Sequence, residues 1–340
     1  MTSRILEKLS CPIIGAPMAG GPSTPALAAA VSNGGGLGFL ASGNKDVALL
    51  VQDIRDCAQL TAGKPYGVNF FYPQSHHTDP DALDRVHQLV KKECDAVGIE
   101  QPAMPTVDYS NDFLAKREAV FTACSEGYGP TVVSSSFGCF TAEEIRQFHS
   151  AGVEVWASVT SVREAEEALT RGVDALVVQG HEAGGHRLTW DARETPNLSS
   201  TAELCSVLHD QHPDAVLIAA GGIRTPKDVK AALSLGVSAV SCGSAFLLTC
   251  EAGTSKANRA MISAGGQTLS SRAFSGRMAR GIATNFSLSH PDLPCSYPEF
   301  GIMMSPLRNK KGYEYCLVGE RTKLIHPGTV QEVLDYLTGK

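Results

Sequence analysis

Long apolar runs are missing from this chain of 340 residues. No stretch approaches the roughly 18 consecutive apolar residues of a membrane-spanning helix. Glu7 and Lys8 interrupt the N-terminal segment where a secretory signal would need an unbroken apolar region. These absences argue against a membrane protein and against export, so we expect a cytoplasmic protein.

An excess of basic side chains is also lacking. The 29 Lys and Arg residues are outnumbered by 35 Asp and Glu residues, and the net charge of −6 argues against a nucleic-acid-binding surface. None of the ten cysteines belongs to a CxxC pair, so we predict neither a zinc ribbon nor a disulfide framework. The composition, 43% apolar and 19% charged, excludes a disordered chain.

Eight short runs rich in apolar residues recur along the chain, most of them without polar alternation. They cover residues 12–17, 36–41, 66–71, 131–136, 153–159, 175–180, 215–222 and 239–244. Such runs are typical of strands buried on both faces of a parallel sheet. Helix-like segments lie between them, one of which begins with Thr225 and Pro226. The pattern predicts an α/β fold, a (β/α)₈ TIM barrel, with a doubly wound parallel sheet as the alternative because strand order cannot be read from the sequence.

Two long segments interrupt this alternation. One insert, at about residues 72–128, separates the third and fourth predicted strands, and the other follows the eighth strand. Barrel active sites lie at the carboxyl ends of the strands, so both segments are placed to cover the mouth. We predict a barrel from residues 1–245 with about 326–340, including the insert, and a smaller substrate or lid region from residues 246–325.

Glycines mark two consecutive predicted strand ends. Gly221 and Gly222 follow one strand, and Gly243 precedes Ser244 at the end of the next. Bare backbone N–H groups at these barrel positions commonly bind phosphate, so a phosphate-bearing ligand is predicted there. A GxGxxA match at residues 36–41 falls inside a predicted strand, and no helix opens on it, so we do not interpret it as a dinucleotide site.

The densest polar motif, QGHEAGGHR at residues 179–187, directly follows the sixth predicted strand. Its histidines, His181 and His186, are five residues apart rather than the four of HExxH, and Gly-Gly lies between them, so a loop is predicted and a zinc site is not. A histidine in such a loop is a candidate for proton transfer near neutral pH. Weaker polar candidates are His76, His77, Arg277 and Arg280.

Taken together, these segments resemble the nitronate monooxygenase family, formerly called 2-nitropropane dioxygenases. The resemblance covers about residues 10–290. It is carried by PMAGG at residues 17–21, GVNFF around Asn69, QGHEAGGHR, AAGGI at residues 219–223 and GSAFLLTCEAG at residues 243–253, and AFSGRMARG at residues 273–281 also fits. Related flavin enzymes, among them an enoyl-acyl-carrier-protein reductase and NADH:quinone reductases, share much of this set.

The resemblance implies a barrel with a smaller substrate domain and a non-covalently bound FMN. His186 matches the active-site histidine of the family, whereas His181 falls on a variable position of the motif. By the same resemblance, Pro17, Met18 and Ala19 lie against the isoalloxazine ring, Asn69 and Gln179 hydrogen-bond it, Gly184 and Gly185 line its side, and Gly221, Gly222, Gly243 and Ser244 bind the phosphate.

The activity implied is FMN-dependent oxidation of alkyl nitronates and nitroalkanes by O2 to carbonyl compounds and nitrite. His186 would act as the base or as an anion-binding group. The alternatives are an NAD(P)H-dependent FMN reductase acting on a quinone or an enoyl thioester, and a flavin-binding protein without turnover. The expected partners are the small-molecule substrate and O2, with no nucleic acid and no membrane, and a homodimer is one open oligomeric state. The sequence departs from the family at Ser136, where several members carry histidine, and over residues 309–324.

Overall fold

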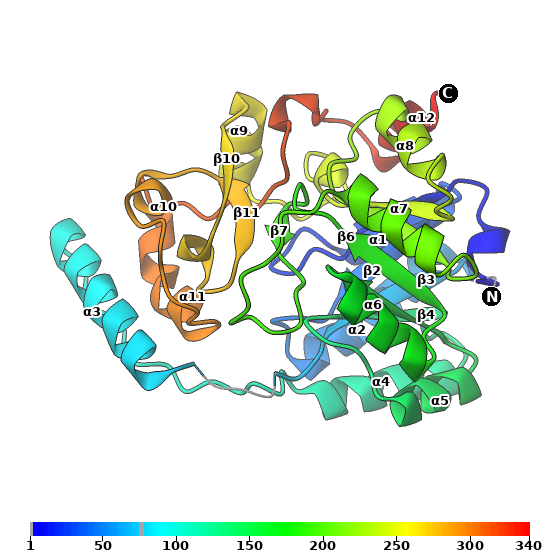
Figure 1. Cartoon of the computed structure of the whole chain (residues 1–340), viewed down its shortest axis with the longest axis horizontal. Coiled ribbons are helices and arrows are strands. Elements are labelled where there is room, and N and C mark those ends of the chain that lie inside the picture. The colour runs from blue at the N-terminus through cyan, green and yellow to red at the C-terminus, as the bar shows by residue number, and fades with distance from the viewer. Residues whose placement is uncertain (1–2, 75–77) are drawn as a thin grey trace.

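A computed structural model describes residues 3–74 and 78–340 of the chain. Eight parallel strands form a closed barrel, with helices packed around it (Figure 1). The strands, in barrel order, are β1 (Ile13–Gly15), β2 (Leu37–Ala41), β3 (Tyr66–Phe71), β4 (Val132–Ser136), β5 (Glu154–Val159), β6 (Ala175–Gln179), β8 (Leu217–Ala220) and β9 (Ala239–Cys242). β9 pairs with β1, which confirms the barrel and rules out the doubly wound sheet. His76 and His77 lie outside the described residues.

Hydroxyl side chains cap several helices of the barrel, including the one predicted to begin at Thr225. Thr24, Ser161, Thr225 and Thr329 each accept a backbone N–H in the first turn of the helix that follows. The helices around the barrel are α1 (Pro25–Asn33), α2 (Val47–Thr61), α4 (Phe113–Ser125), α5 (Ala142–Ser150), α6 (Val162–Arg171), α7 (Thr201–Gln211), α8 (Pro226–Leu233) and α12 (Val330–Thr338). The chance match to a dinucleotide motif has a packing explanation, because a Cβ on Gly38 would collide with the backbone of Ala28 in α1.

The interior of the barrel changes character along its axis. Near the amino ends of the strands it is filled by an apolar cluster that includes Ile14, Phe39, Val132, Trp156 and Ile218. The next inward-facing positions toward the carboxyl ends, two residues further along each strand, are small or carry a hydroxyl or amide. They are Ala16, Ala41, Asn69, Ser134, Ser158, Gln179, Ala220 and Ser241. This contrast leaves room for a ligand at the carboxyl end of the barrel.

The N-terminal segment closes the opposite end. Ile5 packs into the apolar cluster, and the buried carboxylate of Glu154 in β5 accepts hydrogen bonds from Ser3 Oγ (2.6 Å), the Ile5 backbone N (3.0 Å) and Trp156 Nε1 (3.3 Å). These bonds satisfy a charge that would otherwise be costly to bury. The apolar cluster and this segment together close the amino end of the barrel.

A second, three-stranded antiparallel sheet lies beyond the carboxyl ends of the barrel strands (Figure 1). Its order is β10 (Thr268–Ser271), β11 (Ala279–Ile282) and β7 (Gly185–His186). β7 is part of the loop that follows β6, so this sheet is joined directly to the motif at residues 179–187. The sequence analysis did not predict this two-residue strand.

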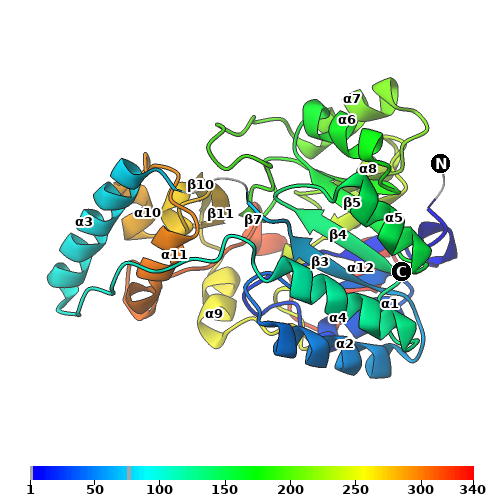
Figure 2. The same ribbon diagram turned by 90° about the horizontal axis from the view of Figure 1, so that it is seen from below.

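Residues 72–128 contribute to both parts of the molecule. Helix α3 (Pro80–Val97) lies beside α10 (Asn285–Ser289) and α11 (Glu299–Met303) in both views (Figures 1 and 2), whereas α4 packs on α2 at the barrel. The apolar face of α3 joins one cluster with Phe300 and Met303. The division into a barrel and a lid at the boundaries given above stays a prediction.

Within residues 3–74 and 78–340, no helix combines the length and the apolar character needed to cross a bilayer.

Candidate active site

The motif at residues 179–187 forms a loop, as predicted, and the side chain of Gln179 ties its ends together. Nε2 of Gln179 donates to the carbonyl of His186 (3.0 Å), and Oε1 accepts from the backbone N of Leu188 (2.9 Å). Gln179 is the last residue of β6, so these bonds fix β7 relative to the barrel. The residue predicted to contact a flavin therefore also positions His186.

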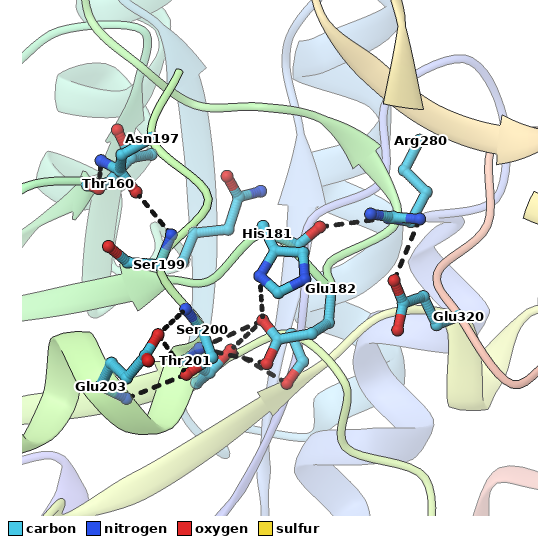
Figure 3. Close-up of polar contacts among 12 residues, drawn as sticks. Thr160, His181, Glu182, Asn197, Ser199, Ser200, Thr201, Glu203, Arg280 and Glu320 are labelled. Atoms are coloured by element: carbon cyan, nitrogen blue, oxygen red, sulfur yellow. Dashed lines mark hydrogen bonds and ion pairs between the residues drawn. The ribbon is translucent and has the colours of Figure 1, made fainter. Parts of the chain in front are cut away.

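Polar contacts on both sides hold the middle of this loop (Figure 3). The carboxylate of Glu182 accepts from the backbone N (3.1 Å) and Oγ1 (3.2 Å) of Thr201, at the start of α7. On the other side, Nε of Arg280 in β11 donates to the carbonyl of His181 (3.1 Å), and its Nη1 pairs with Glu320 (3.1 Å). Arg280 therefore anchors the loop, and the ring of His181 lies beside Glu182 at 3.7 Å.

His186 lies in a pocket of aromatic and polar side chains. Its Nε2 is 2.7 Å from Oγ of Ser275, the residue that follows a short turn before β11. The imidazole is roughly perpendicular to the rings of Phe137 and Tyr297, with centroids 5.9 and 5.4 Å away. Of the two loop histidines, His186 is the one whose ring contacts Phe137 and Tyr297.

The surroundings of His186 disfavour its charged form. Burial, reinforced by the positive charges of Arg277 and Arg308, lowers its pKa from 6.5 to about 3. The guanidinium of Arg277 lies 3.9 Å from the ring centre of Phe137 and donates to the backbone carbonyls of Arg187 and Thr189. His186 is consequently a neutral imidazole at physiological pH.

The glycines at the mouth form a tight cradle. A Cβ on Gly184, which was predicted to line the side of the flavin ring, would collide with the backbone of Gly319 and lie 2.9 Å from Oγ of Ser244. Gly221 and Gly222 have φ angles of +117° and +71°, which side-chain-bearing residues rarely adopt. Bare backbone at strand ends of this kind is a surface that can bind an anionic group.

Asn69 is oriented by the neighbouring strand. Its Oδ1 accepts hydrogen bonds from Ser134 Oγ (2.8 Å) and Ser136 Oγ (3.2 Å), both in β4. These two bonds place Nδ2 on the opposite edge of the amide. Ser136, where several family members carry histidine, thus positions Asn69.

The residues after β1 come close to the end of β9. Pro17, Met18 and Ala19 are partly buried, and Met18 N donates to Ser23 Oγ (2.8 Å). A Cβ on Gly243 would lie 3.4 Å from the sulfur of Met18. The first and last strand ends therefore meet at the same edge of the mouth.

Comparisons with known proteins agree with this architecture. The family model for nitronate monooxygenase matches residues 3–335. The chain belongs to the nitronate monooxygenase family. This is a family of flavoenzymes, and the protein is an oxidoreductase.

Individual relatives cover most of the chain. It is 37% identical over 295 residues to a nitronate monooxygenase of Paraburkholderia phytofirmans, covering 84% of this chain and 78% of that one. A nitronate monooxygenase of Pseudomonas aeruginosa is 34% identical over 304 residues, covering 86% and 84%. The structure of a nitroalkane oxidase from Streptomyces ansochromogenes superimposes with a TM-score of 0.89 at 30% identity, over 99% of this chain and 97% of that one. FabK from Thermotoga maritima (TM-score 0.73, 24% identity, covering 100% and 96%) shares the fold.

Several side chains of this nitronate monooxygenase family member were not found by sequence reasoning. Ser275, Phe137 and Tyr297 surround His186 but come from three separate segments, and no spacing rule connects them. The positive φ of Phe137 (+68°) places its ring beside Arg277 and His186. The AFSGRMARG segment that carries Ser275 and Arg277 formed part of the family resemblance, which was the available signal.

All ten cysteines are free, and seven are buried. Burial raises the pKa of Cys139 and Cys242 to about 12, so neither is suited to act as a thiolate nucleophile. No group of three or more potential metal-ligating side chains occurs in the part of the chain that the structure describes.

Proposed function

We propose that this protein binds FMN at the carboxyl end of its barrel and oxidises alkyl nitronates and nitroalkanes with O2, yielding carbonyl compounds and nitrite. The observation that carries the proposal is the neutral imidazole of His186, which is hydrogen-bonded to Ser275. It belongs to the loop at the carboxyl end of the barrel, where the inward-facing side chains are small or polar. Membership of the nitronate monooxygenase family supports the same class of reaction.

The arrangement of the mouth suits FMN. Gly221, Gly222, Gly243 and Ser244 offer a cradle for the phosphate, and the adjoining Gly184 has no room for a side chain. Around the isoalloxazine ring we propose Pro17, Met18, Ala19, Asn69, Gln179, Gly184 and Gly185. When bound, FMN supplies the redox chemistry, accepting electrons from the organic substrate, with O2 as the oxidant.

We assign the base function to His186. A nitroalkane becomes an electron-rich nitronate when its α-proton is removed, and a neutral imidazole has a lone pair ready to accept that proton. Oγ of Ser275 lies 3.4 Å from the carbonyl of Arg277, to which it can donate. We therefore assign the tautomer in which Nε2–H of His186 donates to Ser275 and Nδ1 accepts the proton. The negative charge of the nitronate then stabilises the imidazolium that forms. The resting imidazole is neutral, so it has a free lone pair for a proton and carries no positive charge with which to bind an anion.

The experiment that tests the reaction compares two substrates in wild type and in His186→Asn. A nitroalkane requires removal of its proton, whereas a preformed nitronate does not. We expect the variant to keep its flavin absorbance and its turnover of propyl-2-nitronate within a few-fold. Its kcat/KM for the nitroalkane should fall by about 100-fold or more, in the range for a lost general base.

Unchanged nitroalkane turnover in His186→Asn would refute the base assignment. Flavin reduction by NADH or NADPH under nitrogen, with no response to the nitronate, would refute the oxidase proposal and support a reductase of a quinone or an enoyl thioester. A protein that binds no FMN would overturn the whole proposal.

We also propose a cytoplasmic location, which the ten free cysteines support because such thiols persist in reducing compartments. The homodimer stays a prediction, which sedimentation equilibrium would test.

A further inference from the structure

Arg224 is a buried cation with an incomplete set of hydrogen bonds. It follows the Gly221-Gly222 pair at the end of β8, and only 4% of its surface is exposed. Its Nη1 donates to the carbonyl of Ile223 (2.8 Å), but its buried Nε has no partner within the described part of the chain. A buried guanidinium is costly without an anion, so its presence indicates a partner that the chain does not supply.

The nearest carboxylates are engaged elsewhere. Asp228 pairs with the guanidinium of Arg321 (2.9 Å), and Glu320 pairs with Arg280 (3.1 Å). Among residues 3–74 and 78–340, Arg224 itself makes no ion pair. Burial is the main cause that lowers its pKa to about 10, so the side chain still carries its positive charge at neutral pH.

The guanidinium lies directly against the glycine cradle. A Cβ on Gly319 would collide with Nη2 of Arg224, so the two groups are in close approach. The backbone N of Gly319 in turn donates to Oγ of Ser244 (3.0 Å), and a Cβ on Gly184 would meet both. A positive charge therefore lies next to the residues proposed to hold a phosphate.

The amino end of helix α8, which follows Arg224, does not offer the phosphate a positive potential in place of the guanidinium. Many phosphate sites use the amino end of a helix. At the start of α8, however, the carboxylate of Asp228 accepts from the backbone N of Arg224 (2.9 Å) and of Thr225 (2.8 Å). This negative charge offsets the helix dipole, and Arg321 is already paired with it. Within residues 3–74 and 78–340, the guanidinium of Arg224 at this corner forms no ion pair, although Asp228 and Glu320 lie in its surroundings.

We propose that the guanidinium of Arg224 is the counter-charge of the flavin's phosphoryl group. The proposal rests on the proposed function, because that function supplies the phosphate monoester. Arginine suits the task, since its planar fork donates two hydrogen bonds to one phosphate and keeps its charge when buried. Arg224 also lines a cavity of about 310 Å³ with Ala245 and Tyr336. A free phosphate ion bound in this cavity would be an alternative partner for the guanidinium, with the same chemistry.

The test compares two flavins that differ only by the phosphate. Dissociation constants for FMN and riboflavin are measured by flavin fluorescence on the deflavinated full-length protein, in wild type, Arg224→Met and Arg224→Lys. Methionine preserves the length of the side chain without its charge, and lysine preserves the charge. We expect Arg224→Met to weaken FMN binding by about 10- to 100-fold, as for loss of a buried charge-assisted contact. Riboflavin binding should change by less than about threefold, and Arg224→Lys should recover only part of the FMN preference, because lysine supplies a charge without the two-pronged hydrogen bond.

A competition experiment on the wild-type protein tests the same proposal and does not depend on whether a variant folds. Inorganic phosphate should compete with FMN but leave riboflavin binding unchanged.

Equal weakening of FMN and riboflavin in Arg224→Met would show a purely structural role and overturn the proposal. The proposal would also fail if FMN-loaded wild type bound inorganic phosphate, and Arg224→Met lost that binding while keeping its FMN-to-riboflavin ratio. Arg224 would then serve a free ion in the cavity. If wild type bound neither FMN nor riboflavin, the proposed function itself would be wrong. This outcome differs from a structural role of Arg224 and from phosphate binding in the cavity.

Discussion

The unusually low pKa of His186 leads to a pH dependence that an ordinary histidine base would not show. The shift from 6.5 to about 3 corresponds to about 5 kcal/mol against the imidazolium form. A base with a pKa of 6.5 would be only about 3% neutral at pH 5, so kcat/KM would fall about 30-fold from its value at pH 8. With a pKa of about 3, more than about 90% of His186 stays neutral at pH 5, and the loss should be less than twofold.

The assay is the initial rate of nitrite formation from a freshly diluted nitroalkane between pH 4.5 and 8.5, at constant ionic strength. Flavin absorbance at each pH verifies that the cofactor stays bound. Arg277→Met provides a companion measurement, because removing a positive charge beside the imidazole should raise the pKa of His186 and move the loss of activity toward neutral pH. An acid limb near pH 6.5 in wild type, unaffected by Arg277→Met, would refute the electrostatic argument.

Two further changes address the positions of individual groups. Ser275→Ala removes the hydroxyl 2.7 Å from His186 Nε2 and should lower kcat for a nitroalkane about tenfold. Turnover of a preformed nitronate and the FMN dissociation constant should stay unchanged. Equal losses of kcat on both substrates would contradict a role of Ser275 in orienting the proposed base. Gly184→Ala introduces a Cβ that collides with the backbone of Gly319, and the cost of overpacking, about 1–3 kcal/mol, should weaken FMN binding by about 5- to 150-fold. Fluorescence titration measures this loss, and tight binding in Gly184→Ala would show that the cradle has more room than the structure indicates.

The barrel could be predicted from the sequence because its strands are buried on both faces and are short runs of mainly apolar and small residues. Each of the eight expected runs contains an observed strand, and the ends differ by no more than two residues. The strand ends also indicated the glycines and the histidine loop, since a parallel barrel gathers all carboxyl ends at one mouth.

The small sheet and the packing of α3 could not be predicted in the same way. β7 has only two residues, Gly185 and His186, and its partner Arg280 is more than ninety residues away, so no local periodicity marks the pair. α3 has an apolar face with Val86 and Val90, but the sequence does not say which surface that face covers. Arg224 was passed over although it lies two residues after the glycine pair, because its unsatisfied burial is visible only in three dimensions.

His186 belongs at once to the barrel loop and to the sheet beyond it, since β7 pairs with β11 while Gln179 ties its backbone to β6. A hinge motion that carried β11 away from the mouth would therefore pull on the base itself. Opening of the barrel mouth and displacement of the proposed proton acceptor, His186, would then be one event.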